Sequence, residues 1–290
     1  MMAIPDVQNM AAMLVDPNGK GLEDHWSKAA FAMLGGAILH CCIMVRQSQK
    51  RTATLYDLSC MLADESRTIQ DLFKEMVETD HATLLREIFP EGVGGDKAHV
   101  FIASSAREML NKAENEASGV VSTALTNLAL YRDPVVALNT AHCDFRIHDL
   151  MNHEKPVNLY LVISPADIDR MRPLLRLMVD MIVRRICAKM EFADGSSKAS
   201  YKHRLLLLLD EFTSLGKLPI MEKVLVFFIL QNYIFILYFQ YNRRILFPLC
   251  VHPRLTESVL GVGRLAGTFL LFIALENRLF SRYNSFSGKQ

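Results

Sequence analysis

Five consecutive leucines, Leu205-Leu206-Leu207-Leu208-Leu209, lead directly into the acidic pair Asp210-Glu211 and then into Phe212. A charged segment precedes this run and a polar, glycine-containing segment follows it, so the apolar stretch has the length of one strand. Continuous apolar runs of this kind are typical of strands that are covered on both faces in a parallel sheet. Because ligands of such sheets bind beyond the carboxyl ends of the strands, Asp210 and Glu211 are candidates for a functional site.

An apolar strand that ends in Asp-Glu is the pattern of a Walker B element. In that interpretation Asp210 holds Mg²⁺, directly or through water, and Glu211 polarises the attacking water. Alternatively, the two carboxylates are solvated residues that open a helix, where they favour the positive end of the helix dipole. These residues alone leave both interpretations open.

The loop that would hold the nucleotide phosphates is not found in this sequence. A P-loop needs a glycine-rich turn followed by Lys and then Ser or Thr, because backbone N–H groups and the lysine must neutralise the phosphates. The nearest candidates are residues 17–21 and 92–97, and neither has this spacing or a Ser or Thr after the lysine. We interpret both as ordinary turns.

Composition gives no sign of a chain that binds nucleic acid through its overall charge. The 290 residues include 32 Lys and Arg against 31 Asp and Glu, a net charge of +1, so any contact with DNA would have to be local. The six cysteines show neither metal-ligand spacing nor a dense disulfide framework, which suggests a reducing compartment. They are Cys41, Cys42, Cys60, Cys143, Cys187 and Cys250.

Residues 1 to about 155 have mainly helical patterns. An apolar helix is expected over residues 29–44, in which Gly35-Gly36 predicts close contact with a neighbouring element. A longer helix is expected to start at Ser105, whose spacing to Glu108 is that of a capping box, and to run to Tyr131, before Asp133-Pro134. Shorter helices are predicted over residues 54–62, 68–78 and 82–88.

The pattern changes after Pro156. A strand is predicted over residues 157–163 and a helix from Pro173, in its first turn, to Met190. With the strand at 205–209 these segments form a β-α-β unit, which calls for a parallel sheet.

The predicted helix after Pro173 has a charged stripe as well as an apolar one. Arg176, Asp180 and Arg184 recur every four residues on this stripe, and Arg184 and Arg185 are therefore most simply interpreted as a solvated face.

Four segments resemble, in the same order, the TraG-type coupling proteins of conjugation and type IV secretion. They are VQNMAAMLVDPNGKGLEDHWSKAA (7–30), EASGVVSTALTNLALYRDPVVALNTAHCDFRIHDL (116–150), VNLYLVISPADIDRMRPLLRLMVDMIVRRI (157–186) and LLLLLDEFTSLGKLPIMEKVL (205–225). The resemblance covers about three quarters of the chain. It is specific, because several separate motifs agree where Asp-Glu-Phe alone would not.

The resemblance implies an α/β fold, in which a RecA-like P-loop NTPase sheet carries an inserted all-helical domain. Residues 1–155 would be the helical domain, 156–240 a partial RecA-like domain with the Walker B element, and 241–290 a divergent hydrophobic tail. Asp210 and Glu211 would be the Walker B pair, with Asp210 as the metal ligand and Glu211 as the catalytic residue. Gln240 would match a glutamine at a strand end that senses the phosphate.

The resemblance also implies partners and a location. Family members are hexameric motors at the cytoplasmic face of the bacterial inner membrane, and they use ATP and Mg²⁺ to deliver single-stranded DNA with its relaxase to the type IV secretion channel. The chain is similar to a truncated member without the N-terminal membrane segment and P-loop, so we expect no autonomous ATPase activity. The alternative is a non-enzymatic helical module, in which residues 1–155 bind relaxase or accessory proteins.

One stretch near the end of the resemblance has a second interpretation. Val224 to Tyr241 is uncharged and close to the length that spans a bilayer, and Arg243-Arg244 follow as a flank. Gln231 and Asn232 at its midpoint argue against insertion in a membrane, and the resemblance implies a buried helix and strand instead.

Overall fold

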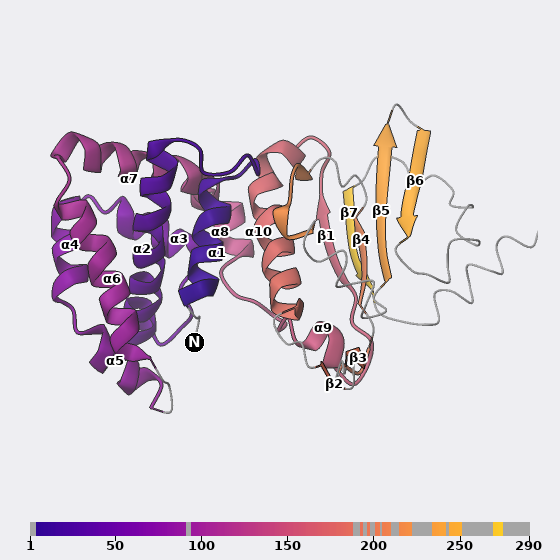
Figure 1. The fold of residues 1–290 in the computed structure, drawn as a ribbon, viewed down its shortest axis with the longest axis horizontal. Helices are drawn as coiled ribbons and strands as arrows, with labels where there is room; N and C mark the ends of the chain where they lie inside the picture. Colours follow the sequence, from indigo (N-terminus) through magenta and orange to yellow (C-terminus); the bar gives the residue numbers. More distant parts are fainter. Residues whose placement is uncertain are drawn as a thin grey trace, which may run out of the picture. The chain divides into compact units, whose positions relative to one another are not determined.

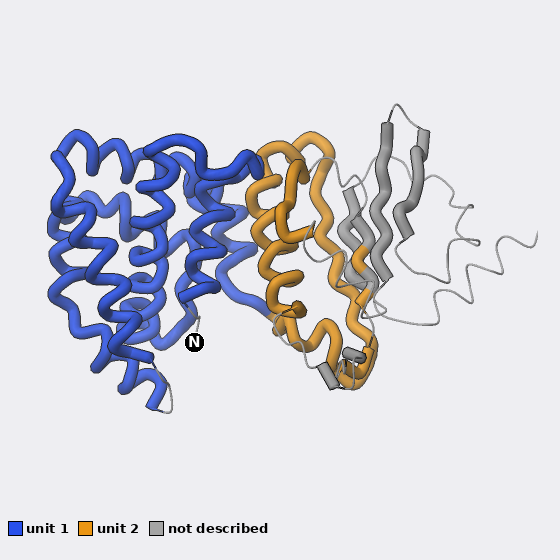
Figure 2. The backbone as a smooth tube through the Cα atoms, in the orientation of Figure 1, with its two compact units in different colours: residues 1–143 blue, residues 144–290 orange. Residues whose placement is uncertain are grey.

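The structure is a computed structural model that describes residues 4–90, 94–187, 192–193, 196–197, 201–203, 205–209, 215–221, 234–241, 244–250 and 269–274. Two compact units divide the chain, residues 1–143 and residues 144–290 (Figure 2). The sequence placed the division near residue 155, and the segment 144–155 lies in the second unit.

The described part of the first unit is helical throughout (Figure 1). Its elements are α1 (Ile4–Val15), α2 (His25–Gln49), α3 (Leu55–Leu62), α4 (Ile69–Glu78), α5 (His81–Ile88), α6 (Gly95–Leu110), α7 (Glu114–Leu128), the 3-10 helix η1 (Ala129–Arg132) and α8 (Pro134–Asn139).

Helix α2 is the core of this unit and contacts α1, α5, α6 and α7. Asp24 begins it by accepting a hydrogen bond from the Ser27 backbone N–H at 2.8 Å, which satisfies one free amide of the first turn. Apolar side chains around its circumference, such as Met33, Leu34 and Leu39, are buried because neighbours cover it on several sides.

The crossing of α2 and α6 confirms the close contact predicted at Gly35-Gly36. A Cβ on Gly36 would overlap the Ser105 hydroxyl and lie 2.9 Å from Ser105 Cβ. The prediction that Ser105 caps a helix is wrong, because Ser105 lies inside α6 and donates its hydroxyl to the Ile102 carbonyl at 3.1 Å. A serine three residues before a glutamate therefore fits two roles, a helix cap and a small residue at a tight helix crossing.

Two helices, α6 and α7, are present in the region where one long helix was predicted to start at Ser105. Helix α6 ends before Asn111, and α7 begins with Glu114 and Glu116 in its first turn, where carboxylates suit the helix dipole. Asp133 then ends η1 and also starts α8, since its carboxylate accepts hydrogen bonds from the Val135 and Val136 backbone N–H groups.

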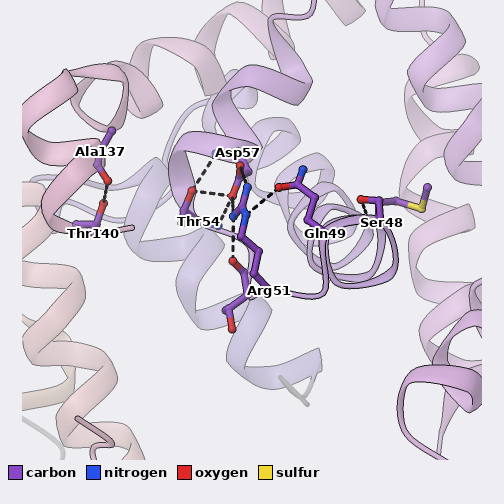
Figure 3. Close-up of polar contacts among 9 residues, drawn as sticks. Ser48, Gln49, Arg51, Thr54, Asp57, Ala137 and Thr140 are labelled. Carbon is purple, nitrogen blue, oxygen red and sulfur yellow. Dashed lines mark hydrogen bonds and ion pairs between the residues drawn. The ribbon is translucent and has the colours of Figure 1, made fainter. Parts of the chain in front are cut away.

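The predicted helices at 54–62, 68–78 and 82–88 are confirmed as α3, α4 and α5, within a residue at their starts. Figure 3 shows the start of α3, where Thr54 and Asp57 form a capping box. The Asp57 carboxylate also accepts two hydrogen bonds from the Arg51 guanidinium, at 2.6 and 2.7 Å. These hydrogen bonds from Arg51 and the cap lower the pKa of Asp57 to about 2.

The described part of the second unit combines helices and strands. Its elements are α9 (Asp149–Asn152), β1 (Leu159–Ile163), α10 (Ile168–Cys187), β2 (Phe192–Ala193), β3 (Ser196–Ser197), β4 (Leu206–Leu209), β5 (Ile234–Tyr241), β6 (Arg244–Cys250) and β7 (Phe269–Ala274). The described strands form a sheet in the order β1-β7-β4-β5-β6, and β2 pairs with β3.

The sheet is mixed. Strands β4 and β5 pair in parallel, whereas β7 lies between β1 and β4 and is antiparallel to both. The predicted strand-helix-strand order is present as β1, α10 and β4, but β1 and β4 are not neighbours. Pro173 lies inside α10 rather than in its first turn, because the helix already begins at Ile168.

Candidate functional site

The predicted catalytic pair follows β4 directly. Leu209 is the last residue of that strand, and Asp210 and Glu211 lie outside the described residues. Gln240 lies in β5, the parallel neighbour of β4. Leu209 is paired with Leu237, so position 240 is three residues beyond the end of the β4 pairing on the adjacent strand.

The chain is described again from Leu215 to Met221, just after the acidic pair and the segment 210–214. Leu215, Leu218, Ile220 and Met221 are buried, whereas Gly216 and Lys217 are exposed. Gly216 has a φ of 66°, a conformation that favours glycine, and it turns the chain between two buried leucines.

Arg176 of α10 binds this turn. Its side chain is 1% exposed, and its Nη1 donates hydrogen bonds to the Leu215 carbonyl at 2.6 Å and to the Lys217 carbonyl at 2.8 Å. Bonds from a guanidinium to carbonyl oxygens are charge-assisted and stronger than those between neutral groups. Helix α10 is therefore fixed to the segment that follows Asp210 and Glu211.

Asp180 lies one turn further along α10 and is completely buried. Its Oδ2 accepts a hydrogen bond from Arg184 Nε at 2.6 Å, and its Oδ1 has no partner among the described residues. A buried carboxylate oxygen without a partner is costly, so it is rarely left in a structure without a role.

The prediction of a solvated face is confirmed for Arg185, which is exposed, and Arg184 is half-exposed. Arg176 and Asp180, on the same charged stripe, are buried. The sequence did contain a signal that Arg176 and Asp180 are buried. Apart from these two residues, the chain from Leu174 to Val183 is entirely apolar. A helix that is apolar all round is buried all round, together with any charge it contains.

The two glycine-containing segments can be compared with the requirements of a phosphate loop. In the first, the Asp16 carboxylate accepts hydrogen bonds from the Lys20 and Gly21 backbone N–H groups at 2.9 and 2.7 Å. These amides already bind an anionic group, so the segment is a turn, as predicted. The second segment lies partly outside the described residues, and its Gly94 precedes α6 with a φ of 101°.

A chain of imidazoles lies within the helical unit. His40 Nδ1 is 2.8 Å from His81 Nε2, His81 Nδ1 is 3.3 Å from His99 Nδ1, and His40 Nε2 is 3.5 Å from Glu75 Oε1. Burial, followed by the neighbouring imidazoles, lowers the pKa of His81 to about 4. No three metal-ligating side chains come together in the part of the chain that the structure describes.

Helix α2 is long and apolar enough, by length and composition, to cross a membrane, with a mean hydropathy of 1.8 in its most apolar window. Since 67% of that window is buried within the structure, the helix also fits the interior of a bundle. In the second candidate stretch, Val224 to Tyr241, residues 224–233 lie outside the described residues and 234–241 form strand β5, so the described part of the stretch is not helical.

The chain combines a helical unit with a second unit that contains helix α10 and the strand that precedes Asp210 and Glu211. Comparison with known families shows the class of protein to which it belongs. Residues 2–240 match the model of the family described as type IV secretory system conjugative DNA transfer. The chain belongs to this family, as its resemblance to TraG-type coupling proteins predicted, and the match extends from the last similar segment, which ends at residue 225, to residue 240.

Two relatives from Escherichia coli, each named conjugal transfer protein TraG, are 50% and 47% identical to the chain over 224 residues. A VirD4 protein from Agrobacterium fabrum is 27% identical over 217 residues. These alignments cover 77% and 75% of the chain but only 33% and 28% of the relatives, so the chain spans about a third of their length. No solved structure gives a significant match.

Proposed function

We propose that the chain supplies the Walker B part of an ATP-driven coupling protein for conjugal DNA transfer, and that this part does not hydrolyse ATP alone. In this proposal Asp210 holds Mg²⁺ and Glu211 polarises the attacking water, while Gln240 senses the phosphate. The surrounding sheet would be the partial RecA-like domain, with the helical unit as its insertion. The observation that carries the proposal is the family match over residues 2–240, which includes all three positions.

The strand pairing supports this assignment. Strands β4 and β5 are parallel neighbours, so their carboxyl ends lie at the same edge of the sheet, with Asp210 next after β4 and Gln240 in β5. A carboxylate is the type of ligand that Mg²⁺ prefers. ATP bound there with its Mg²⁺ would have a metal ligand, a residue for positioning water and a polar side chain on the adjacent strand.

The same chemistry explains the absence of autonomous activity in the proposal. Phosphoryl transfer depends on positioning and charge neutralisation at the β- and γ-phosphates, which a P-loop and its lysine provide. The sequence of 290 residues contains no such loop. In the turn at residues 16–21, the Lys20 and Gly21 backbone N–H groups already donate hydrogen bonds to the Asp16 carboxylate. In this proposal a longer form of the protein or another polypeptide supplies the phosphate loop.

A chimera tests the catalytic pair. Residues 2–240 replace the matching region of the Escherichia coli TraG relative, and ATP turnover is measured with and without single-stranded DNA, together with transfer frequency. We expect the chimera to be active, and Glu211→Gln to reduce turnover by about a hundredfold or more. Asp169→Asn, a surface change at the start of α10, should leave it unchanged.

Two results would contradict the proposal. Equal turnover by the Glu211→Gln and unsubstituted chimeras would remove Glu211 from the mechanism. ATP hydrolysis by the purified 290-residue chain, abolished by Glu211→Gln, would show that it is an autonomous motor. Delivery of DNA and relaxase to the secretion channel, hexamer formation and a position at the inner membrane follow from the family and are part of the same proposal.

An alternative is a helical module that binds relaxase or accessory proteins. Residues 1–143 contain 12 Lys and Arg against 18 Asp and Glu, a formal charge of −6, although the whole chain is nearly neutral. An acidic surface disfavours DNA and favours a basic protein partner. Binding of the full chain to its relaxase that weakens with salt, and is unaffected by Asp210→Asn, would support this function.

A further inference from the structure

Three histidines in the interior of the helical unit have no role in the function proposed above. His40 of α2 and His81 of α5 are 1% and 0% exposed, whereas His99 of α6 is half-buried. Beyond His40, the carboxylate of Glu75 on α4 lies 3.5 Å from His40 Nε2, and its side chain is 34% exposed. Four helices thus contribute one group each to a row that begins and ends at half-buried side chains.

We infer that the imidazole chain (His40, His81 and His99) and Glu75 form a proton relay, in which His81 passes a proton from His99 to the pair of His40 and Glu75. Glu75 sets the direction of the hydrogen bonds in this relay. All four residues belong to the first unit, and the relay does not depend on the roles proposed for Asp210 and Glu211.

The Glu75 carboxylate determines which nitrogen of His40 carries the proton. Contacts with His40 and with Arg67, which donates a hydrogen bond to Glu75 Oε2, lower the pKa of Glu75, so this carboxyl is ionised at neutral pH. A distance of 3.5 Å is long for a hydrogen bond, but a carboxylate at this distance attracts an N–H group and repels a ring lone pair. His40 therefore carries its proton on Nε2, and its Nδ1 is an acceptor.

The direction set at His40 continues along the chain. Because His40 Nδ1 accepts, His81 Nε2 is the donor of the 2.8 Å hydrogen bond between the two rings. A neutral imidazole has one donor and one acceptor, so His81 Nδ1 accepts, and His99 Nδ1 donates across the 3.3 Å that separates these two nitrogens. Every hydrogen bond thus points towards Glu75, and His99 Nε2 is the unprotonated end of the chain.

Proton transfer along the chain reverses its hydrogen bonds. A hydronium ion donates a proton to the lone pair of His99 Nε2 and leaves as water, and the proton of His99 Nδ1 moves to His81 Nδ1. The proton of His81 Nε2 then moves to His40 Nδ1, so the added charge reaches the His40 ring beside the Glu75 carboxylate. His99 and His81 are neutral again, each with its proton on the other nitrogen.

The charged groups around the chain favour a positive charge at its ends over one at its centre. The Glu75 carboxylate offsets a charge on His40, against the opposing charge of Arg67, and Asp80 at the start of α5 acts on both His81 and His99. Burial, followed by the neighbouring imidazoles, lowers the pKa of His81 to about 4. His81 therefore stays neutral near pH 7 and transmits the proton rather than storing it.

Nitrogen NMR of the full chain, isotopically labelled only at histidine, tests the direction. Protonated and unprotonated ring nitrogens have well-separated chemical shifts, and single His→Gln variants assign the three rings. At neutral pH we expect His40 and His81 to carry their protons on Nε2 and His99 on Nδ1, each favoured by about tenfold or more, because reversal would lose the contact with the charged carboxylate. A proton mainly on Nε2 of His99 would overturn the proposal.

A substitution at Glu75 tests its control of the distant ring. In Glu75→Leu, the preference of His99 for a proton on Nδ1 should fall by about fivefold or more, because the carboxylate no longer fixes the direction. Glu78→Leu, which removes an exposed carboxylate of the same helix, is the matched control and should leave the three rings unchanged. An unchanged His99 ring in Glu75→Leu would contradict the inference.

His81→Leu tests whether the effect travels through the chain. With the central ring removed, adding Glu75→Leu should not change His99 further, and an effect that persists would mean that the carboxylate acts directly through space, without a relay. Trp26 fluorescence shows whether each variant is folded. The comparison of the wild type with Glu75→Leu needs no change at the centre, so the test stays decisive if His81→Leu folds poorly.

Acid titration of the same signals tests the transfer itself. As the pH falls below neutral, His40 should become protonated on both nitrogens, and at the same midpoint His99 should exchange its proton from Nδ1 to Nε2 while it remains neutral. Protonation of both His99 nitrogens before those of His40 would show that the proton stays where it enters, and the relay would be wrong.

Discussion

Acidification should destabilise the helical unit through His81, at the centre of its imidazole chain. The His81 side chain is completely buried, its Nε2 lies 2.8 Å from His40, and the pKa of its imidazole is lowered from 6.5 to about 4. Because the folded-state pKa is the lower one, the unfolded state binds more protons between these two pH values. The stabilising contribution of neutral His81 is complete above about pH 6.5 and is lost as the pH falls through 4.

The size of the effect follows from the shift. Each pKa unit corresponds to about 1.4 kcal/mol, so the shift gives at most about 3 kcal/mol. About 2 kcal/mol of this is lost between pH 6.5 and 4.5, since the unfolded ring begins to bind its proton at the upper value and the folded ring is still mostly neutral at the lower one. This is a large part of the 5–15 kcal/mol that is typical of a domain.

The single tryptophan provides the assay. Trp26 belongs to α2, and its ring lies where a Cβ on Gly119 of α7 would meet it, so its fluorescence reports on the packing of the helical unit. Urea unfolding followed by this signal between pH 7.5 and 4.5 gives the free energy of unfolding. His81→Gln should be less stable at pH 7.5 but should lose less stability on acidification than the wild type.

The matched control is His142→Gln, which changes an exposed histidine of the same unit. It should keep the pH dependence of the wild type. The reasoning is refuted if His81→Gln and the wild type lose the same free energy of unfolding between pH 6.5 and 4.5.

Three further changes test the packing of the same unit. Gly36→Ala should lower the free energy of unfolding by about 1–2 kcal/mol, since overpacking against Ser105 exceeds the gain in helix propensity, and Ser105→Ala should recover more than half in thermal melts. Tyr131→Phe should leave stability unchanged or raise it by up to about 1 kcal/mol in urea unfolding, because the hydroxyl is buried with no partner among the described residues; a larger loss would reveal one. Asp57→Asn should cost about 1 kcal/mol at pH 7 through the lost cap and the ion pair with the half-exposed Arg51. Because the pKa of Asp57 is lowered to about 2, this difference should be present above about pH 4 and vanish as the pH falls toward 2, and a pH-independent difference would argue against it.

Local chemistry made some of the fold predictable from the sequence. The starts of α3 and α4 were found within a residue, because Thr54 and Thr68 accept hydrogen bonds from amides only three positions away. Ser105 has the same spacing to an acidic residue and is not a cap. Ser105 lies at the helix crossing against Gly36, which is far away in the sequence. The spacing of residues within one segment cannot reveal such a long-range contact.

The same limit applies to the candidate site. The sequence directed attention to Asp210 and Glu211 because they end an apolar run, and the family match covers both. It placed Arg176 on a charged stripe and did not find its burial, because the groups to which it donates include backbone carbonyls at positions 215 and 217. Any residue type supplies a carbonyl, so no side-chain pattern could have identified the partner of this arginine.

The central place of α2 affects how the helical unit folds during synthesis. Its cover includes α6 and α7, and both are made after it, with α7 complete only at Leu128. About 80 residues separate the end of α2 from that point, which takes about 4 to 16 s at 5–20 residues per second. During this interval the nascent chain contains an apolar helix long enough to span a bilayer whose later covering helices have not yet been made, and exposed apolar surface of this kind is prone to aggregation.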